Sequence, residues 1–158
     1  MKKIIITGNK NLSNLINIFE DIMNNIGIDY EITEIDNNVS IHVFDDKEDM
    51  AYYVISNVDS EIKTAHIDIP SYTLITLGVN KKSSVTMSSL GGDLDTSKTL
   101  IYCIQREIYE ENIVIEPQEI PVFVKSKWGH DIYNIMSAVT AALIVDINIS
   151  DKLKKIYF

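Results

Sequence analysis

The apolar positions of the first third of the chain follow two spacings, one typical of strands and one typical of a helix. Residues 2–7 (KKIIIT) form a short β-branched run that predicts a buried strand. Apolar residues from Leu12 to Ile26 then recur at three-and-four spacing, and Gly27 is well placed to end the helix that they predict. Two further strands are predicted at residues 29–35 and 39–44, with the turn signal Asn37-Asn38 between them.

The middle of the chain continues this alternation. Residues 46–58 (DKEDMAYYVISNV) predict a second helix with Asp45 or Asp46 as its N-cap. Residues 63–69 and 72–78 predict two strands separated by Pro70. The sequence thus resembles an ordinary α/β chain up to this point.

The last half of the chain has a different pattern. Residues 83–125 predict strands joined by short turns, with Gly91-Gly92 and Glu110-Glu111-Asn112 as turn sites, which is typical of an antiparallel extension of a sheet. Residues 131–145 predict a strongly apolar helix, and Ser150 or Asp151 is expected to cap a last short helix. The fold class predicted for residues 1–158 is therefore a single α/β domain: a mixed sheet with flanking helices and an antiparallel strand extension.

Composition and charge narrow the classes of function. The chain has 158 residues, 46% of them apolar, which suits one globular core. Its formal net charge of −9 would repel a phosphate backbone or an anionic membrane, and its lysines form only scattered pairs. We therefore expect no nucleic-acid partner and no membrane. Since the first residues predict a strand rather than a signal peptide, we expect a cytoplasmic protein.

Four segments resemble, in the right order, the ATP-binding central domain of the Mur ligases, a family that also includes the folylpolyglutamate synthases. They are IIITGNKNLSNLI near the N-terminus, VFDDKEDMAYYV, LITLGVNKKSSVTMSSL, and GHDIYNIMSAVTAAL near the C-terminus. The resemblance implies a reduced P-loop-type fold with an ATP and Mg²⁺ site formed by the first and last of these segments.

The first segment departs from the family's loop, which reads TGTNGKTT. Here Gly8 is followed by Asn9, Lys10 and Asn11, so that aligning Lys10 with the family's lysine leaves the loop two residues short and without its second glycine. Asn11 then stands where a threonine hydroxyl should bind Mg²⁺. A Gly-rich loop wraps phosphate with its backbone N–H groups, and the shortened loop cannot form the same anion nest.

The last segment keeps more of the family's pattern. His130, Asp131 and Asn134 match the family's HNxxN at a helix start, where the resemblance implies contacts to a ribose or an adenine edge. Asp131 replaces an asparagine there and suits a capping role, with Asn134 bonded to nearby backbone. The candidate nucleotide-binding residues are therefore Gly8, Lys10, Asn11, His130 and Asn134. The family's acidic metal ligand and modified lysine have no counterpart in this chain, so no catalytic residue is predicted.

Other candidate chemistry is weaker. His42 and His66 lie on predicted strands with no Cys or His partner at metal spacing, so no metal site is predicted. Cys103 lies in an apolar run that is typical of a buried structural thiol. Arg106 either pairs with Glu116 or Glu119 across a hairpin or is exposed together with Trp128 as an interface anchor.

These observations favour a non-catalytic Mur-ligase-like domain, a pseudoenzyme that acts as a protein-interaction or regulatory module. Its partner would be another protein or a second copy of the chain. A link to cell-wall synthesis or division follows from the family analogy alone. The alternative is a residual nucleotide-binding accessory subunit of an ATP-dependent ligase, which would use Lys10 and the helix start at His130 to Asn134.

Overall fold

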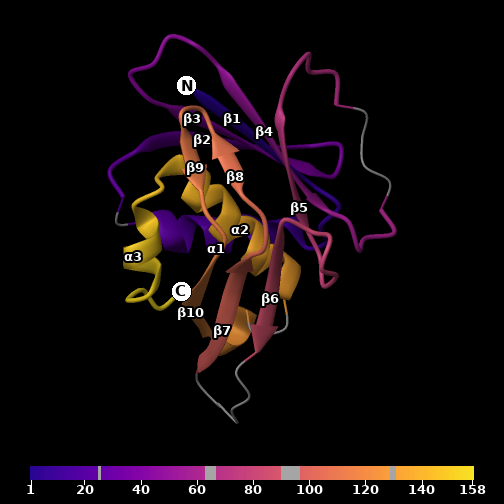
Figure 1. Cartoon of the computed structure of the whole chain (residues 1–158), viewed down its shortest axis with the longest axis vertical. Coiled ribbons are helices and arrows are strands. Elements are labelled where there is room, and N and C mark those ends of the chain that lie inside the picture. Colours follow the sequence, from indigo (N-terminus) through magenta and orange to yellow (C-terminus); the bar gives the residue numbers. More distant parts are fainter. Residues whose placement is uncertain (25, 63–66, 90–96, 129–130) are drawn as a thin grey trace.

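The computed structural model describes residues 1–24, 26–62, 67–89, 97–128 and 131–158. Within these ranges the chain forms a mixed α/β fold built on an eight-stranded sheet of order β10-β7-β6-β5-β4-β1-β3-β2 (Figure 1). The strands of this sheet are β1 (Lys2–Thr7), β2 (Asp29–Ile35), β3 (Asn38–Phe44), β4 (Ala51–Asn57), β5 (Thr73–Leu77), β6 (Val85–Ser89), β7 (Ser97–Ile104) and β10 (Gln118–Lys125). A separate hairpin pairs β8 (Ile108–Glu110) with β9 (Ile113–Ile115).

The centre of the sheet is parallel and both flanks are antiparallel. Strand β4 lies between β1 and β5 and is parallel to both, and β5 meets β6 at a single parallel pair, Leu77 with Val85. On one side β3 and β2 continue antiparallel from β1, and on the other β7 and β10 continue antiparallel from β6. This arrangement confirms the predicted mixed sheet and its antiparallel extension in the second half of the chain.

Two helices lie against each other on one face of the sheet. They are α1 (Leu12–Met23) and α2 (Ile132–Val145), and α3 (Ile149–Leu153) lies beside β10. Helix α2 is buried over almost its whole length, because it lies between α1 and the strands β1, β4, β5 and β6. None of the described helices combines the length and the apolar character needed to cross a membrane.

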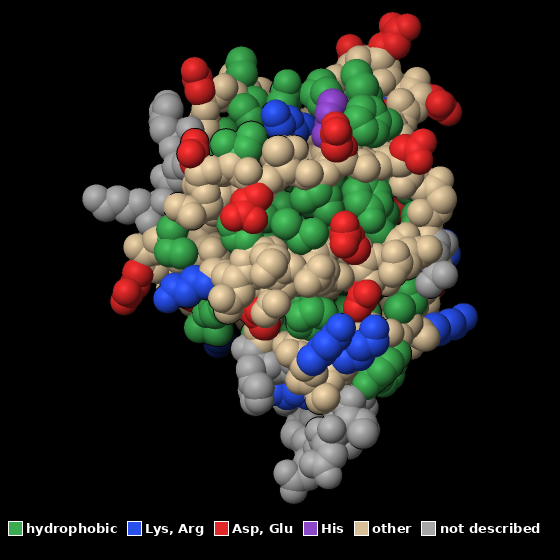
Figure 2. Space-filling view, turned by 180° about the vertical axis from the view of Figure 1, so that it is seen from behind, with side chains coloured by type: hydrophobic (Ala, Val, Ile, Leu, Met, Phe, Trp, Pro, Cys, Tyr) green, Lys and Arg blue, Asp and Glu red, His purple; other side chains and the backbone are tan. Residues whose placement is uncertain are grey.

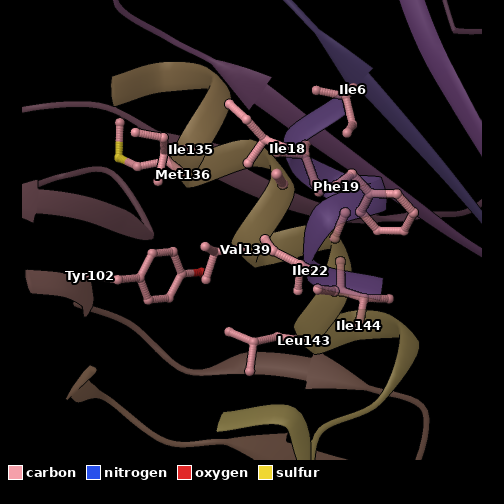
Figure 3. Close-up of a cluster of buried hydrophobic side chains, with 14 of the residues drawn as sticks. Ile6, Ile18, Phe19, Ile22, Tyr102, Ile135, Met136, Val139, Leu143 and Ile144 are labelled. Carbon is pink, nitrogen blue, oxygen red and sulfur yellow. The ribbon is translucent and has the colours of Figure 1, made fainter. Parts of the chain in front are cut away.

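The core is the apolar layer between this helix pair and the inward face of the sheet. Figure 3 shows Ile18 and Ile22 of α1 facing α2, with Tyr102 of β7 reaching in from the sheet toward Val139, whereas Phe19 points away from α2. These side chains are at most 2% exposed. The Tyr102 hydroxyl lies 2.7 Å from the Thr140 hydroxyl, so its polar end is paired inside the core. Burial also raises the pKa of Tyr102.

The predicted helix at residues 46–58 is wrong. Residues 51–57 form β4, whose side chains Tyr53, Val54 and Ile55 are all buried. A central strand that is covered on both faces has a continuous apolar run, and such a run cannot be distinguished from a buried helix by its spacing alone. Hydrogen-bonded pairing with β1 and β5 makes residues 51–57 a strand. The acidic residues before β4 form a loop rather than a helix N-terminus.

Several smaller predictions are also settled. Residues 67–69 lie outside the strands, while residues 63–66 and the Gly91-Gly92 turn lie outside the described residues. The turn at Glu110-Glu111-Asn112 is confirmed, with Glu111 at φ 50° between β8 and β9. The N-cap of α3 is Asn148 rather than Ser150 or Asp151.

The two expectations for Arg106 and Trp128 both fail. Trp128 is 7% exposed and lies under the Lys127 ammonium, 4.3 Å from the ring centroid, so it is not an exposed anchor. Arg106 is exposed, and within the described ranges it forms no ion pair with Glu116 or Glu119.

Two other single residues come close to what the sequence suggests. Cys103 is half-buried rather than fully buried, and burial raises the pKa of its thiol. His42 packs against Phe44 with ring centroids 4.6 Å apart, as a packed strand residue should.

Candidate functional site

A cavity of about 430 Å³ lies where the carboxyl ends of β1 and β4 meet the start of α2. In open α/β sheets this edge, next to the carboxyl ends of parallel strands, is the usual place for a ligand. Three segments line it: Gly8, Lys10 and Asn11 after β1; Asn57, Asp59, Ser60 and Glu61 at the end of β4; and Asp131, Tyr133 and Asn134 at the start of α2.

Gly8 makes the turn that leads from β1 into this cavity. Its φ is +82°, a conformation that residues with a Cβ rarely adopt. A Cβ at this position would also lie 3.0 Å from the Asn57 carbonyl oxygen. The Asn57 side chain donates back to the Gly8 carbonyl at 3.4 Å, so the ends of β1 and β4 are held together.

Asn134 connects the loop after β1 to α2. Its side chain is completely buried, and its Nδ2 lies 2.8 Å from the Lys10 carbonyl, 3.1 Å from the Asn11 carbonyl and 2.9 Å from Asp131 Oδ2. An amide nitrogen has two hydrogens, so these three acceptors share its donors. The loop therefore presents its carbonyl oxygens, not its N–H groups, to this side chain.

Asn9 makes the reciprocal connection, and the sequence did not single it out as a site residue. It is 3% exposed, and its Nδ2 donates to Asn134 Oδ1 at 2.8 Å and to Ser137 Oγ at 2.7 Å. The signal that could have found it lies on α2, where Asn134, Ser137 and Thr140 repeat at three-residue spacing on an otherwise apolar helix. Such a polar stripe needs partners on the facing segment.

Asp131 occupies the N-cap position of α2 without acting as a side-chain cap. Its Oδ2 instead accepts from Asn14 Nδ2 of α1 at 3.1 Å and from Asn134. Asp131 therefore occupies the predicted N-cap position without making a side-chain capping bond, and Asn134 bonds to the backbone of the distant loop after β1 rather than to backbone near it in sequence. Asp131 joins the starts of α1 and α2.

Tyr133 and Asp59 close the opposite wall of the cavity. The Tyr133 hydroxyl donates to Asp59 Oδ2 at 2.8 Å, and the Val79 backbone N–H donates to the same oxygen at 2.8 Å. Burial, followed by this bond to the Asp59 carboxylate, raises the pKa of Tyr133 to about 12. The phenol is therefore neutral at physiological pH and serves as a donor rather than a base.

The charges around the cavity favour a cation or a neutral group over an anion. Three carboxylates, those of Asp59, Glu61 and Asp131, line it beside the single lysine Lys10, which is itself exposed. Phosphate groups would meet a net negative lining. No cluster of three or more His, Cys, Asp or Glu in the described part of the chain is placed to hold a metal ion.

The structure brings together four of the five residues predicted for nucleotide binding. Gly8, Lys10, Asn11 and Asn134 line one cavity although more than a hundred residues separate the loop from α2. His130 lies outside the described residues. Asn11 has φ 53°, and its carbonyl accepts from Asn134 and from the Asn14 backbone N–H.

Comparisons of the chain with family models, with curated proteins and with solved structures found no match. The resemblance to the Mur ligases therefore stays a prediction, and the function is argued from the geometry of the site.

Proposed function

We propose that this chain is a non-catalytic α/β domain that acts as a protein-interaction or regulatory module. One observation carries this proposal: the loop from Gly8 to Asn11 is bonded to α2 through Asn9 and Asn134. In this arrangement the loop is a structural joint between β1 and α2. The bonds fix the Lys10 and Asn11 carbonyls and the Asn9 side chain against α2, so the shape of the loop is set by the protein's own side chains.

The electrostatics of the cavity support the same proposal. A triphosphate brings several negative charges, and the cavity presents three carboxylates against Lys10. Each added phosphate charge would be repelled at short range, where solvent screening is weakest. The neutral Tyr133 hydroxyl is bonded to Asp59, so it is already engaged as a donor.

Exposed apolar side chains support an interaction role. The helices cover one face of the sheet, and on the other face side chains such as Leu74 of β5 and Phe44 of β3 are 53% and 44% exposed. Figure 2, seen from behind the view of Figure 1, shows hydrophobic side chains in several groups with acidic side chains between them. Parallel strands usually have both faces covered. Exposed apolar side chains on the face without helices therefore suit an interaction with a partner that covers part of this face.

A thermal-shift titration with Mg-ATP and Mg-ADP tests the proposal, beside a sizing run that distinguishes a monomer from a self-associated chain. We expect no saturable shift at millimolar nucleotide, and we expect Lys10→Ala to have the melting temperature of the parent chain. A saturable shift that Lys10→Ala abolishes would overturn the proposal.

A second candidate is a residual nucleotide-binding accessory subunit of an ATP-dependent ligase. The position of the cavity at the carboxyl ends of parallel strands and the positive φ of Gly8 favour it. The Lys10-dependent shift described above is the result that it predicts.

The link to cell-wall synthesis or division follows from the Mur ligase resemblance and stays a prediction. The cytoplasmic location is a prediction of the same kind, since it depends on sequence features alone.

A further inference from the structure

A second groove, of about 460 Å³, lies at the other end of the parallel strands, where β4 and β5 begin. Its walls include Met50, Tyr52, Pro70, Tyr72, Tyr109 and Glu111. Tyr72 and Tyr109 are 43% and 57% exposed, which is unusual for two large rings lining the same groove. Tyrosine and methionine are both enriched in protein interfaces relative to the rest of the protein surface. We call this surface the tyrosine groove.

The tyrosine groove is held on fixed elements. Strand β4 pairs with β1 from Ala51 onward, and Tyr53 pairs with Thr73 at the start of β5. The β8–β9 hairpin is anchored by Glu110, whose carboxylate lies 2.6 Å from the buried Lys2 ammonium. Side chains alternate along a strand, so anchoring Glu110 toward the core turns its neighbour Tyr109 outward to the groove, and Glu111 follows in the turn after β8.

Exposed acidic side chains lie next to two of the segments that line this groove. The loop that ends at Met50 contains the exposed Asp46, Glu48 and Asp49, and Glu107, just before β8, accepts a hydrogen bond from the Tyr109 hydroxyl. Lys47 pairs with Glu111 and the N-terminal ammonium pairs with Asp45, so these two pairs are neutral overall and the negative charge beside the groove comes from Asp46, Glu48, Asp49 and Glu107. Electrostatic attraction therefore favours the binding of a positively charged ligand to this surface.

We propose that the tyrosine groove binds an extended, basic, proline-containing segment of a partner protein. Proline-rich segments are preformed in the polyproline II conformation and dock into grooves lined by aromatic rings, because little conformational entropy is lost. Arginine side chains on the same segment would pair with the acidic rim and stack over tyrosine faces. This inference rests on the proposed function as a protein-interaction module and names the partner's chemistry.

A second copy of the chain suits the groove less well. Each copy carries a formal charge of −9, so bringing one acidic rim against another acidic surface is unfavourable. Self-association through this groove is the outcome that a sizing run of the free chain would detect.

Fluorescence anisotropy with the whole chain tests the inference. The probe is a fluorescein-labelled peptide that repeats Arg-Pro-Leu-Pro, and two matched peptides replace every proline by alanine or every arginine by glutamate. We expect saturable binding of the first peptide and affinities weaker by about tenfold or more for the other two. Tyr72→Ala and Tyr109→Ala should each weaken binding of the first peptide by about tenfold, whereas Phe123→Ala, which removes an exposed ring on β10, should leave it unchanged.

Absence of saturable binding would overturn the inference, as would equal binding of the proline and alanine peptides or insensitivity to both tyrosine substitutions. A dimer in the sizing run that Tyr72→Ala dissociates would overturn it in favour of a second copy. The proposed function fails by a different result, namely Lys10-dependent binding of Mg-ATP. The two failures are therefore separately measurable.

Discussion

The side-chain amide of Asn134 donates to the backbone carbonyl of Lys10 at 2.8 Å, across more than a hundred residues of sequence. Both the donor and the neighbouring Asn9 amide are buried, so the loop after β1 and the start of α2 form one bonded unit. A loop fixed in this way has its shape determined by the protein's own side chains. That is the physical basis for interpreting the Gly8–Asn11 segment as a joint.

Replacing Asn134 should therefore destabilise the fold. Asn134→Ala leaves the Lys10 and Asn11 carbonyls and the Asn9 amide without this partner, and we expect a loss of about 2–4 kcal/mol in the free energy of unfolding. Asn148→Ala is the matched control, because Asn148, although it is the N-cap residue of α3, is exposed, makes no side-chain capping bond and donates to the nearby Asp146. Urea denaturation of both variants checks this, and equal stability of the two would contradict the joint.

Gly8→Ala tests the turn that places the loop. The added Cβ would lie 3.0 Å from the Asn57 carbonyl oxygen, and the residue would keep a φ of +82°. We expect a loss of about 1–3 kcal/mol, measured as a lower urea midpoint. Gly27→Ala provides the comparison, since a Cβ there has no atom within 4 Å. If both variants melted like the parent chain, the turn would not depend on glycine.

The buried ion pair between Lys2 and Glu110 should support both the hairpin and the tyrosine groove. Glu110→Ala leaves the Lys2 ammonium with the Ile144 carbonyl, 2.7 Å away, but without a countercharge. We expect a loss of about 3–5 kcal/mol, the usual effect of breaking a buried pair from one side. The exposed pair of Lys154 with Asp151 is the control, and Asp151→Ala should cost less than about 1 kcal/mol. Similar losses in the two variants would show that the Lys2 pair is not buried in solution.

The pKa of Tyr133, raised to about 12, predicts a loss of stability at alkaline pH. Above a pH of about 10 the unfolded chain ionises its tyrosines while the folded chain keeps Tyr133 protonated. The stabilisation is therefore fully present below about pH 10 and is lost as the pH rises toward 12. Tyrosinate absorbance during an alkaline titration checks this. Tyr133→Phe should remove one late-ionising tyrosine, and an unchanged titration curve would contradict the assignment.

The sequence predicts much of the fold because most elements have a pattern of their own. The isoleucine run of β1, the helical spacing of α1 and the long apolar helix α2 are each visible locally. Strand β4 is not, because Tyr52 to Ile55 are apolar on both faces and only pairing with β1 and β5 decides their conformation. The misleading signal was the acidic run before this strand, which resembles the N-terminus of a helix.

The candidate site was predictable only in part, for a related reason. Gly8, Lys10, Asn11 and Asn134 were found by a pattern that assigns them to a nucleotide, and the structure does place them around one cavity. Their hydrogen-bonding partners could not be predicted, since they depend on how α2 approaches the loop. Asn9 became significant only when Ser137 and Asn134 were seen to face it. The Tyr72 and Tyr109 pair likewise depends on how the hairpin folds over the start of β4.

The most direct test of the central claim follows backbone amides by NMR during a titration with Mg-ATP. The amides of Gly8, Lys10, Leu12 and Ser13 report on the loop and the first turn of α1, where a phosphate would bind. We predict no saturable shift of these signals at millimolar nucleotide. Saturable shifts of these amides that are lost in Lys10→Ala would contradict this prediction and would make the loop a nucleotide site.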